Sequence, residues 1–215
     1  MRGDPQPLTD ESDAIRRCQQ GDIGALGALV THYQTPAVRL AYLLTGDHDL
    51  ANDIAQDSFL LAWRGIQRFR LGEPFAPWFF RIVTNCARQQ MRSARYRREV
   101  SLDALVSDDP HTRRLGDSLA SAQASRADPE ERAERAEAWA ALLAALATLP
   151  QKQREAVVLR YYLGYPDKQA AMILGCRVGA LQQRLHDGRA SLQRAIRTRY
   201  PWLLNSLPTL SPSEP

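Results

Sequence analysis

The sequence has few cysteines and no long hydrophobic run. Its three cysteines, Cys18, Cys86 and Cys176, lie far apart, which suits neither a disulfide framework nor a metal site of the Cys-x-x-Cys kind. We expect each to be a small buried apolar residue. No stretch approaches the roughly 20 apolar residues of a membrane span, and the polar start, MRGDPQPLTDESD, lacks the apolar run of a signal peptide. These absences predict a cytoplasmic protein with no direct membrane insertion.

The sequence also lacks the patterns of an enzyme. Its four histidines show no ligand spacing with one another or with a cysteine, and it contains no glycine-rich phosphate loop. No set of nucleophile, base and oxyanion donor is recognisable. We therefore expect no catalysis, no metal, no cofactor and no small-molecule substrate. What the chain does carry is a net charge of +4 that is unevenly placed along it, which points to a partner for its basic segments.

The distribution of helical periodicity predicts an all-α fold of two small helical domains. Residues 13–98 and residues 134–199 carry apolar residues at helical spacing, and we call them the first and second blocks. Residues 99–133 between them are too polar over most of their length to bury a core, so we expect a flexible linker with a short docking turn around residues 102–106.

Both flanks of the second block carry structural signals of their own. A helix is expected to begin at Pro129, behind Asp128 as its cap, and to run to about Leu149. The tail, residues 200–215, is broken by prolines and should be loosely ordered, although Trp202, Leu203 and Leu204 are candidates to fold back on a core.

A helix predicted over residues 50–67 has two distinct faces. One stripe is apolar and should pack: Ala51, Ala55, Phe59, Ala62 and Ile66. The opposite stripe should point outward: Asp53, Gln56, Asp57, Leu60 and Arg64. Such an outward face can be simply solvated or can bind a partner, and periodicity alone favours the first interpretation.

The next predicted helix, over residues 78–98, aligns four arginines along one side. Arg81, Arg88, Arg92 and Arg95 follow one another at spacings of seven, four and three, and we call them the arginine stripe. Stacked guanidinium groups repel one another unless an anion meets them, and they bind phosphates through forked hydrogen bonds. Nucleic-acid binding is therefore favoured over a merely solvated face. At least two of the preceding Trp78, Phe79 and Phe80 should be core residues, while one could stack on an unpaired base.

The second block has the spacing of a helix-turn-helix. Residues 151–164 predict a helix that packs through Val157, Val158, Tyr161 and Tyr162, and Pro166 opens another short helix. Ala171, Gly175 and Leu181 then supply a small residue at the helix contact, a turn glycine and an apolar anchor. Other helical hairpins share these features, so the motif alone leaves DNA binding and plain helix packing equally open.

The helix that begins near Val178 would be the recognition helix. Its inward residues should be Val178, Leu181, Leu185 and Leu192. Its DNA-facing residues would be Gly179, Gln182, Gln183, His186 and Asp187. Phosphates would be contacted from the flanks by Arg177, Arg184 and Arg189. Because the outermost face has no lysine or arginine and Asp187 would be repelled by phosphates, we expect weak DNA affinity from this block alone.

Three segments, taken in order, resemble one protein family. They are ANDIAQDSFLLAWRGIQRF, EPFAPWFFRIVTNCARQQMR and LPQKQREAVVLRYYLGYPDKQAAMILGCRVGALQQRLHDGRASL. Together they resemble the extracytoplasmic-function (ECF) group of the bacterial sigma-70 family of RNA polymerase sigma factors. The resemblance implies promoter-specific transcription initiation with RNA polymerase core enzyme and promoter DNA as partners. It also implies an anti-sigma factor that masks both domains.

The resemblance also implies roles for individual residues. Asp53, Gln56 and Asp57 would bind the clamp helices of the largest polymerase subunit, with Phe59 structural. The minus-ten element and the melted strand would be held by the loop of residues 72–77 and by Asn85, Arg88, Arg92 and Arg95. The polymerase flap and the minus-thirty-five element would be contacted by the second block, with Arg177, Gln182, Gln183, Arg184 and His186 facing DNA.

The recognition helix departs from the family pattern. Where family members often carry Thr-Val-Lys-Ser-Arg-Leu, residues 180–185 here read Ala-Leu-Gln-Gln-Arg-Leu. Pro166, Asp167 and Ala170 replace the usual Ser, aromatic residue and Ile of the preceding helix. These departures keep an alternative function open, namely a helix-turn-helix regulator or a degenerate sigma-like protein that does not support initiation.

Overall fold

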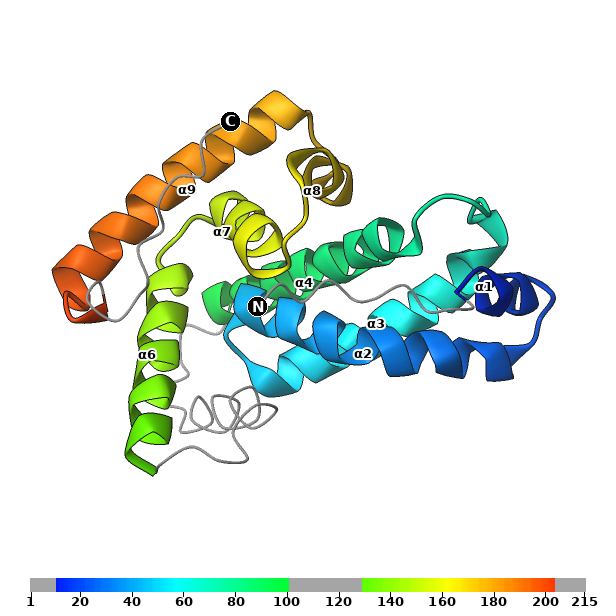
Figure 1. The fold of residues 1–215 in the computed structure, drawn as a ribbon, viewed down its shortest axis with the longest axis horizontal. Coiled ribbons are helices and arrows are strands. Elements are labelled where there is room, and N and C mark those ends of the chain that lie inside the picture. The colour runs from blue at the N-terminus through cyan, green and yellow to red at the C-terminus, as the bar shows by residue number, and fades with distance from the viewer. Residues whose placement is uncertain (1–10, 101–128, 204–215) are drawn as a thin grey trace.

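The computed structural model describes residues 11–100 and 129–203, and all the regular secondary structure in those two ranges is helical (Figure 1). The first block consists of α1 (Glu11–Gln19), α2 (Ile23–Thr45), α3 (His48–Gly65), the short 3-10 helix η1 (Ile66–Arg68) and α4 (Phe75–Val100). The second block contains α6 (Pro129–Ala147), α7 (Gln151–Val157), the π-helical turn η3 (Val158–Tyr162), α8 (Asp167–Leu174) and α9 (Val178–Arg199). The predicted all-α fold is confirmed.

Aromatic packing forms the centre of the first block, where α2, α3 and α4 lie against one another and α1 packs on α2 (Figure 1). The rings of Tyr33 on α2 and Phe75 on α4 lie 5.3 Å apart, and Phe75 stacks on Phe79 at 5.8 Å. Phe79 and Phe80 are fully buried and Trp78 is partly buried, so the prediction of at least two core aromatic residues is confirmed. Their burial stabilises the block by roughly 1.5–3 kcal/mol for each ring.

The helix-turn-helix of the second block forms as its sequence predicts. Gly175 ends α8 in the left-handed conformation with φ of 62°, where a side chain would be strained, and the Cys176 amide donates to the Ala171 carbonyl. Ala171 and Leu181 are buried on either side of the turn. Near the far end of α9, Leu203 packs with Ile196 and with alanines of α6, which confirms that part of the tail folds back.

Three residues of the second block lie elsewhere than predicted. Tyr161 and Tyr162 are exposed by 50% and 37%, whereas Leu159 and Leu163 are buried. The reason is the π-helical turn η3, which adds a residue to the turn and rotates the following side chains away from the 3.6-residue pattern. Val178 is exposed by 36% because it is the first residue of α9, before the helix reaches its packing partners.

Other expectations were met only in part, or lie outside the described residues. Cys18 and Cys86 are buried free thiols as predicted, but Cys176 in the turn is only half-buried. Trp202 is exposed by 38% rather than packed inside. The expected docking turn at residues 102–106, the Asp128 cap and Leu204 fall outside the described ranges. No helix in those ranges is both long enough and apolar enough to cross a membrane.

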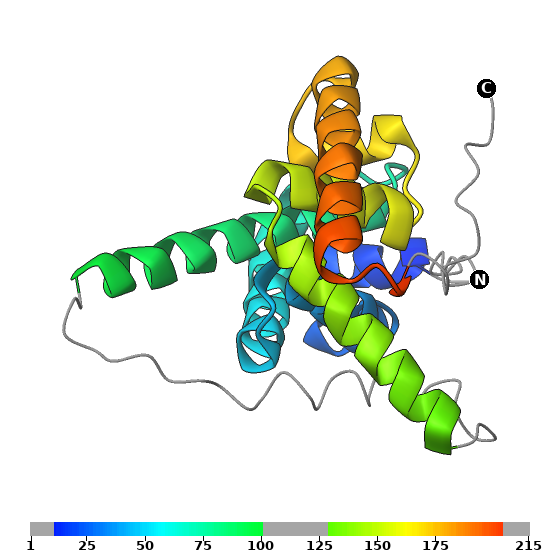
Figure 2. The ribbon, with the colours of Figure 1, turned by 90° about the vertical axis from the view of Figure 1, so that its left-hand side faces the viewer.

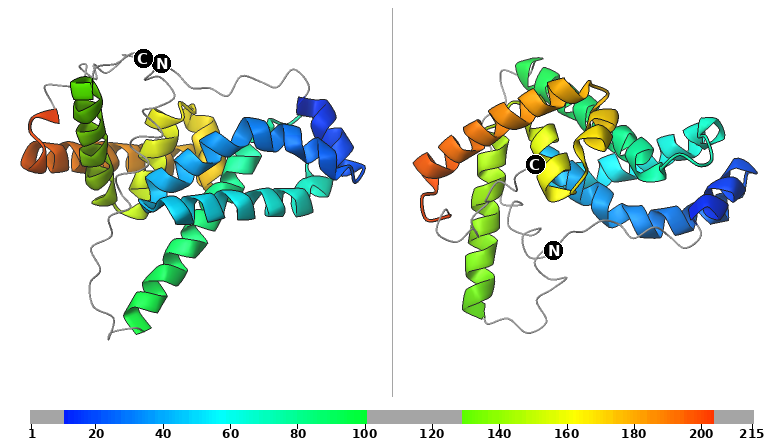
Figure 3. Two further views of the ribbon diagram at one scale, coloured as in Figure 1. Left: turned by 90° about the horizontal axis from the view of Figure 1, so that it is seen from below. Right: turned by 45° about the horizontal axis from the view of Figure 1, so that its top comes forward.

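The two blocks pack on each other and share one continuous apolar core. α8 lies on α4, while α6, α7 and η3 contact α2 (Figure 1). The buried cluster includes residues of both blocks, such as Val83 of α4 and Leu174 of α8. The C-terminal part of α4 leaves this body and projects away from it (Figure 2; Figure 3, left). The arginine stripe therefore starts under the second block and ends beyond it.

Candidate polymerase and nucleic-acid interfaces

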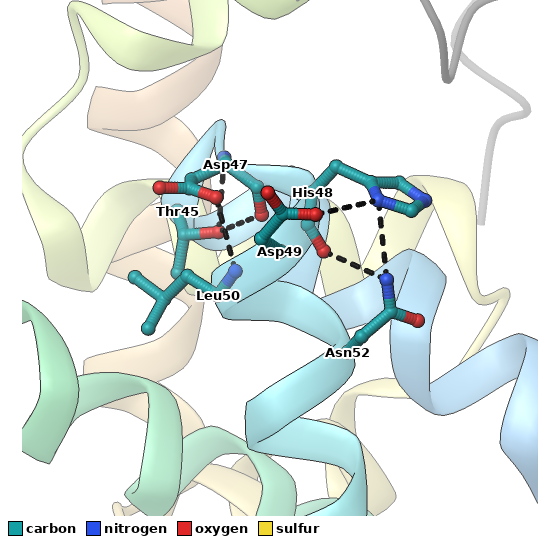
Figure 4. A network of polar contacts seen from close by, with 6 residues as sticks. All are labelled: Thr45, Asp47, His48, Asp49, Leu50 and Asn52. Atoms are coloured by element: carbon teal, nitrogen blue, oxygen red, sulfur yellow. Dashed lines mark hydrogen bonds and ion pairs between the residues drawn. The ribbon is translucent and has the colours of Figure 1, made fainter. Parts of the chain in front are cut away.

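A compact polar network fixes the start of α3, the helix that carries the predicted polymerase-binding residues (Figure 4). The Asp47 carboxylate accepts a hydrogen bond from the Leu50 amide at 3.0 Å and so caps the helix. The Asn52 side-chain amide donates to the His48 carbonyl at 3.0 Å and lies 3.1 Å from the His48 ring. This network orients the first turn of α3, because its amide groups have no partners within the helix.

The outward face of α3 is as polar and accessible as its sequence predicts. All five predicted packing residues are buried, and all five residues of the opposite stripe are exposed. Asp53, Gln56 and Asp57, which we call the acidic face, make no side-chain hydrogen bond or ion pair with the described part of the chain. Leu60, beside them, is exposed by 56%. Two unpaired carboxylates next to an exposed leucine suit a partner with a basic rim and an apolar centre.

The arginine stripe on α4 is divided between two environments. Arg92 is exposed and lies in the C-terminal part of α4. Arg95 lies further along the same helix. Arg81 is also exposed, but its guanidinium lies beside the turn of the second block, where a Cβ on Gly175 would be 3.5 Å from it. Arg88 is half-buried beneath the second block.

Arg88 forms a two-pronged ion pair across the two blocks. Its Nε donates to Oε1 of Glu155 at 2.8 Å, and its Nη2 donates to Oε2 at 2.6 Å. Glu155 lies on α7 and its side chain is fully buried, with a further hydrogen bond from Gln151. Hydrogen bonding to Glu155 raises the pKa of Arg88. Asn85 shares the site, because its side-chain oxygen accepts from Nη1 of Arg88 at 3.2 Å.

The predicted DNA-facing residues at the start of α9 form an accessible surface, but the two glutamines of this surface are hydrogen-bonded to carboxylates. Gln182, Gln183 and His186 are exposed, as is Arg177, whereas Arg184 is half-buried. The Gln182 amide donates to Asp167 at 3.3 Å, and the Gln183 amide donates to Asp187 at 2.9 Å. Each glutamine must release its carboxylate before both edges of its amide can bind an adenine.

Three residues shape these surfaces in ways that the sequence did not predict. Glu155 was not expected to face the arginine stripe, because its partner is 67 positions earlier in the chain. Asp167 holds the Arg160 guanidinium at 3.1 Å as well as Gln182. Gly188 lies against α7, where a Cβ would be 2.8 Å from Cγ2 of Val157. Only Gly188 had a sequence signal, since it falls on the inward face between Leu185 and Leu192.

Two family models match the chain in the order of its two blocks. The model for sigma-70 region 2 matches residues 29–97, and the model for sigma-70 region 4 matches residues 139–192. The first match covers the acidic face and all four residues of the arginine stripe. The second covers the helix-turn-helix and Glu155.

Curated relatives are similar over nearly the whole chain. The chain is 30% identical over 191 residues to the RNA polymerase sigma-H factor of Pseudomonas aeruginosa, covering 88% of this chain and 96% of that protein. It is 29% identical to the ECF RNA polymerase sigma-E factor of Haemophilus influenzae, covering 89% and 97%. It is 31% identical to "Probable RNA polymerase sigma factor RfaY" of Xanthomonas campestris pv. campestris, where it spans 87% of this chain but 43% of that protein.

A solved structure has the same fold. The sigma factor RpoE from Bartonella quintana, crystallised with the anti-sigma factor NepR, aligns with a TM-score of 0.60 at 24% identity, covering 80% of this chain and 97% of that one. At this level of identity the likeness concerns the fold alone.

Proposed function

The chain belongs to the extracytoplasmic-function group of the sigma-70 family of RNA polymerase sigma factors, and from that premise we propose how its surfaces divide the work of promoter-specific initiation. The acidic face binds the clamp helices of RNA polymerase core enzyme. The arginine stripe with Asn85 holds the opened minus-ten strand, and the recognition helix contacts the upstream duplex. Sigma factors are initiation factors rather than enzymes, and we propose that this chain acts in the cytoplasm and catalyses no reaction itself.

The observation that carries this proposal is the acidic face. Asp53, Gln56 and Asp57 lie on one side of a rigid, capped helix, and the part of the chain that the structure describes gives them no ionic partner. Exposed unpaired carboxylates lose little hydration until a basic surface meets them, so they favour fast and specific docking of a positively charged partner. Membership of the sigma-70 family supports assigning polymerase binding to this face.

Replacing both aspartates tests the interface. The double variant Asp53→Ala and Asp57→Ala should bind core polymerase on the order of tenfold more weakly, which corresponds to about 1.4 kcal/mol. Glu137→Ala, which removes an exposed carboxylate of α6, is the matched control and should bind as the wild type does. Circular dichroism should show equal helix content in all three proteins. Unchanged affinity of the double variant would remove the acidic face from the polymerase interface.

Transcription from fragmented genomic DNA tests the function as a whole. Core polymerase supplemented with this protein should start transcripts at sites that share upstream motifs, and these starts should vanish when the protein is omitted. Sequencing the transcript ends also reveals the promoter, including whether a minus-thirty-five motif is present.

Two features of the recognition helix favour a second function. Gln182 and Gln183 are engaged by carboxylates, and the recognition helix lacks the lysine that the family often carries there. A protein of this kind would bind polymerase, or DNA, without supporting initiation. Tight core binding with no transcript starts would favour that regulatory function over the first.

An anti-sigma factor is the remaining partner that we propose. The related RpoE was crystallised with the anti-sigma factor NepR. Both exposed apolar residues of α3, Leu60 and Leu61, are available to such a protein when polymerase is absent.

A further inference from the structure

We propose that Glu155 acts as an internal substitute for a DNA phosphate: it holds Arg88 in a closed arrangement of the two blocks, and DNA must displace it. This Arg88–Glu155 latch makes strand capture and separation of the blocks a single coupled event. The inference rests on the proposed DNA-facing role of Arg88 and adds a competitor for that residue within the same chain.

The geometry of the latch is that of anion recognition. A guanidinium binds a carboxylate or a phosphate through the same pair of parallel N–H donors. In the closed arrangement Nε and Nη2 of Arg88 are both used by Glu155, at 2.8 Å and 2.6 Å. Nη1 is used by Asn85 at 3.2 Å. A phosphate therefore cannot take the forked position on Arg88 until the Glu155 carboxylate has left.

The neighbouring residue on α7 makes a second connection to the first block. Nη1 of Arg154 donates to the Leu44 carbonyl at 2.7 Å, near the C-terminus of α2, and its Nη2 donates to the Ala147 carbonyl at 2.8 Å at the end of α6. Cations are favoured at helix C-termini, where carbonyls lack partners within the helix. Adjacent side chains of α7 thus hold α4 and α2 at the same time, which fixes how the second block sits.

Apolar contacts complete the interface but do not make it sensitive to DNA. Phe80 of α4 meets Tyr165 of the second block edge to face at 5.9 Å, within the shared core. Such contacts contribute roughly in proportion to buried area, whatever anion is in solution. The ion pair differs, because the guanidinium of Arg88 balances the negative charge of the fully buried Glu155. A DNA phosphate offers Arg88 another anion, while water can hydrate the carboxylate once it is exposed, so DNA shifts the equilibrium toward the open chain.

Interdomain distance in the full chain tests the latch directly. Spin labels can be attached at the exposed Gln34 of α2 and Gln193 of α9 through unnatural amino acids, which leaves the three cysteines unlabelled. Pulsed electron paramagnetic resonance then measures the distance between the two labels, and so the separation of the blocks. The wild type should give one narrow distance. Glu155→Gln keeps the shape of the side chain but removes its charge, and it should raise the open fraction about tenfold, because a buried ion pair that loses one charge becomes strongly unfavourable.

Three further proteins separate the latch from a folding defect. Arg88→Gln leaves the second block unaltered and should also open the chain, because the buried Glu155 carboxylate then has no guanidinium partner. The exchanged pair, Arg88→Glu with Glu155→Arg, should restore the narrow distance. Glu137→Gln neutralises an exposed carboxylate of α6 and should keep the wild-type distance. Wild-type distances in both Glu155→Gln and Arg88→Gln would refute the latch.

Binding of a mixed-sequence single-stranded oligonucleotide, followed by fluorescence anisotropy, tests the competition. Glu155→Gln should bind several-fold more tightly than the wild type, and adding Arg88→Gln to it should remove the gain. The oligonucleotide should also lengthen the distance in the wild type. Open variants with no gain in affinity would refute the competition. If Arg88→Gln alone opens the chain yet binds the oligonucleotide as tightly as Glu155→Gln does, the DNA role of Arg88 fails while the closed latch stands.

Discussion

Gly188 is the residue at which α9 comes closest to α7. A Cβ at this position would lie 2.8 Å from Cγ2 of Val157 and 3.4 Å from Cβ of Gln153. The 2.8 Å contact is too short to form unless Val157 or the helices shift, and overpacking of this kind costs about 1–3 kcal/mol. The small residue at 188 therefore determines how tightly the recognition helix is held on its support.

We predict that Gly188→Ala lowers the free energy of unfolding by about 1–3 kcal/mol, whereas Gly179→Ala on the same helix does not. Nothing lies within 4 Å of the Cβ that would be built at Gly179, and alanine is the better helix former by roughly 0.5–1 kcal/mol. Urea denaturation followed by circular dichroism measures both variants. Equal stability of the two would show that α7 and α9 have room to separate.

The three thiols should differ in their reactivity with a thiol-specific reagent. Burial raises the pKa of Cys18 and of Cys86, which lowers the fraction present as reactive thiolate at any given pH, and both thiols are sterically shielded. Cys176, in the turn before α9, is half-buried. We predict one fast reaction and two slow ones in the native chain, with Cys176→Ser abolishing the fast one. Three equal rates would contradict the packing described for the first block.

At the scale of elements, α3 presents the acidic face only while its first turn is ordered. The Asp47 cap satisfies the Leu50 amide, and replacing such a cap with alanine typically costs about 1 kcal/mol. We predict that Asp47→Ala lowers the urea midpoint without changing the slope of the transition, while Asp47→Ser, which can still cap, stays near the wild type. An unaffected midpoint in Asp47→Ala would mean that packing alone holds the start of α3.

The presence of a helix, and which of its residues are exposed, could be predicted from the sequence where one period of apolar residues holds along the whole helix. α3 obeys a 3.6-residue pattern over its whole length, so its buried and exposed stripes were both predicted correctly. The pattern failed where the helix changed type. The π-helical turn η3 rotates Tyr161 and Tyr162 outward, and nothing in the composition of VVLRYY distinguishes it from an α-helical turn.

Contacts between the two blocks could not be predicted, for a different physical reason. Each block was interpreted from its own periodicity, and periodicity carries no information about partners far along the chain. The same stripe that favours DNA binding places Arg88 against a carboxylate 67 positions later. The sequence indicated that Arg88 needs an anionic partner, but it did not show whether that partner is a DNA phosphate or the carboxylate of Glu155.

At the scale of the whole molecule, the arginine stripe spans the boundary between a covered surface and a projecting helix. Arg88 is paired with Glu155 of α7 in the closed chain, whereas Arg92, further along α4, is exposed and takes no part in the latch. The C-terminal part of α4 projects from the body of the molecule (Figure 2). Charge alone makes the two arginines equivalent toward DNA. Their different surroundings predict that only one of them also controls the shape of the chain.

We therefore predict that Arg92→Ala and Arg88→Ala both reduce promoter opening, but that only Arg88→Ala loosens the closed chain. Loss of one phosphate contact should lower the extent of opening by about tenfold or more, since charge-assisted hydrogen bonds contribute roughly 1.5–3 kcal/mol and about 1.4 kcal/mol corresponds to a factor of ten. Permanganate reactivity of unpaired thymines measures opening, and small-angle scattering of the free protein measures compactness. Arg92→Ala should keep the wild-type radius of gyration. Full opening by Arg92→Ala would exclude the projecting part of α4 from strand capture, and a compact Arg88→Ala would show that the blocks stay together without their ion pair.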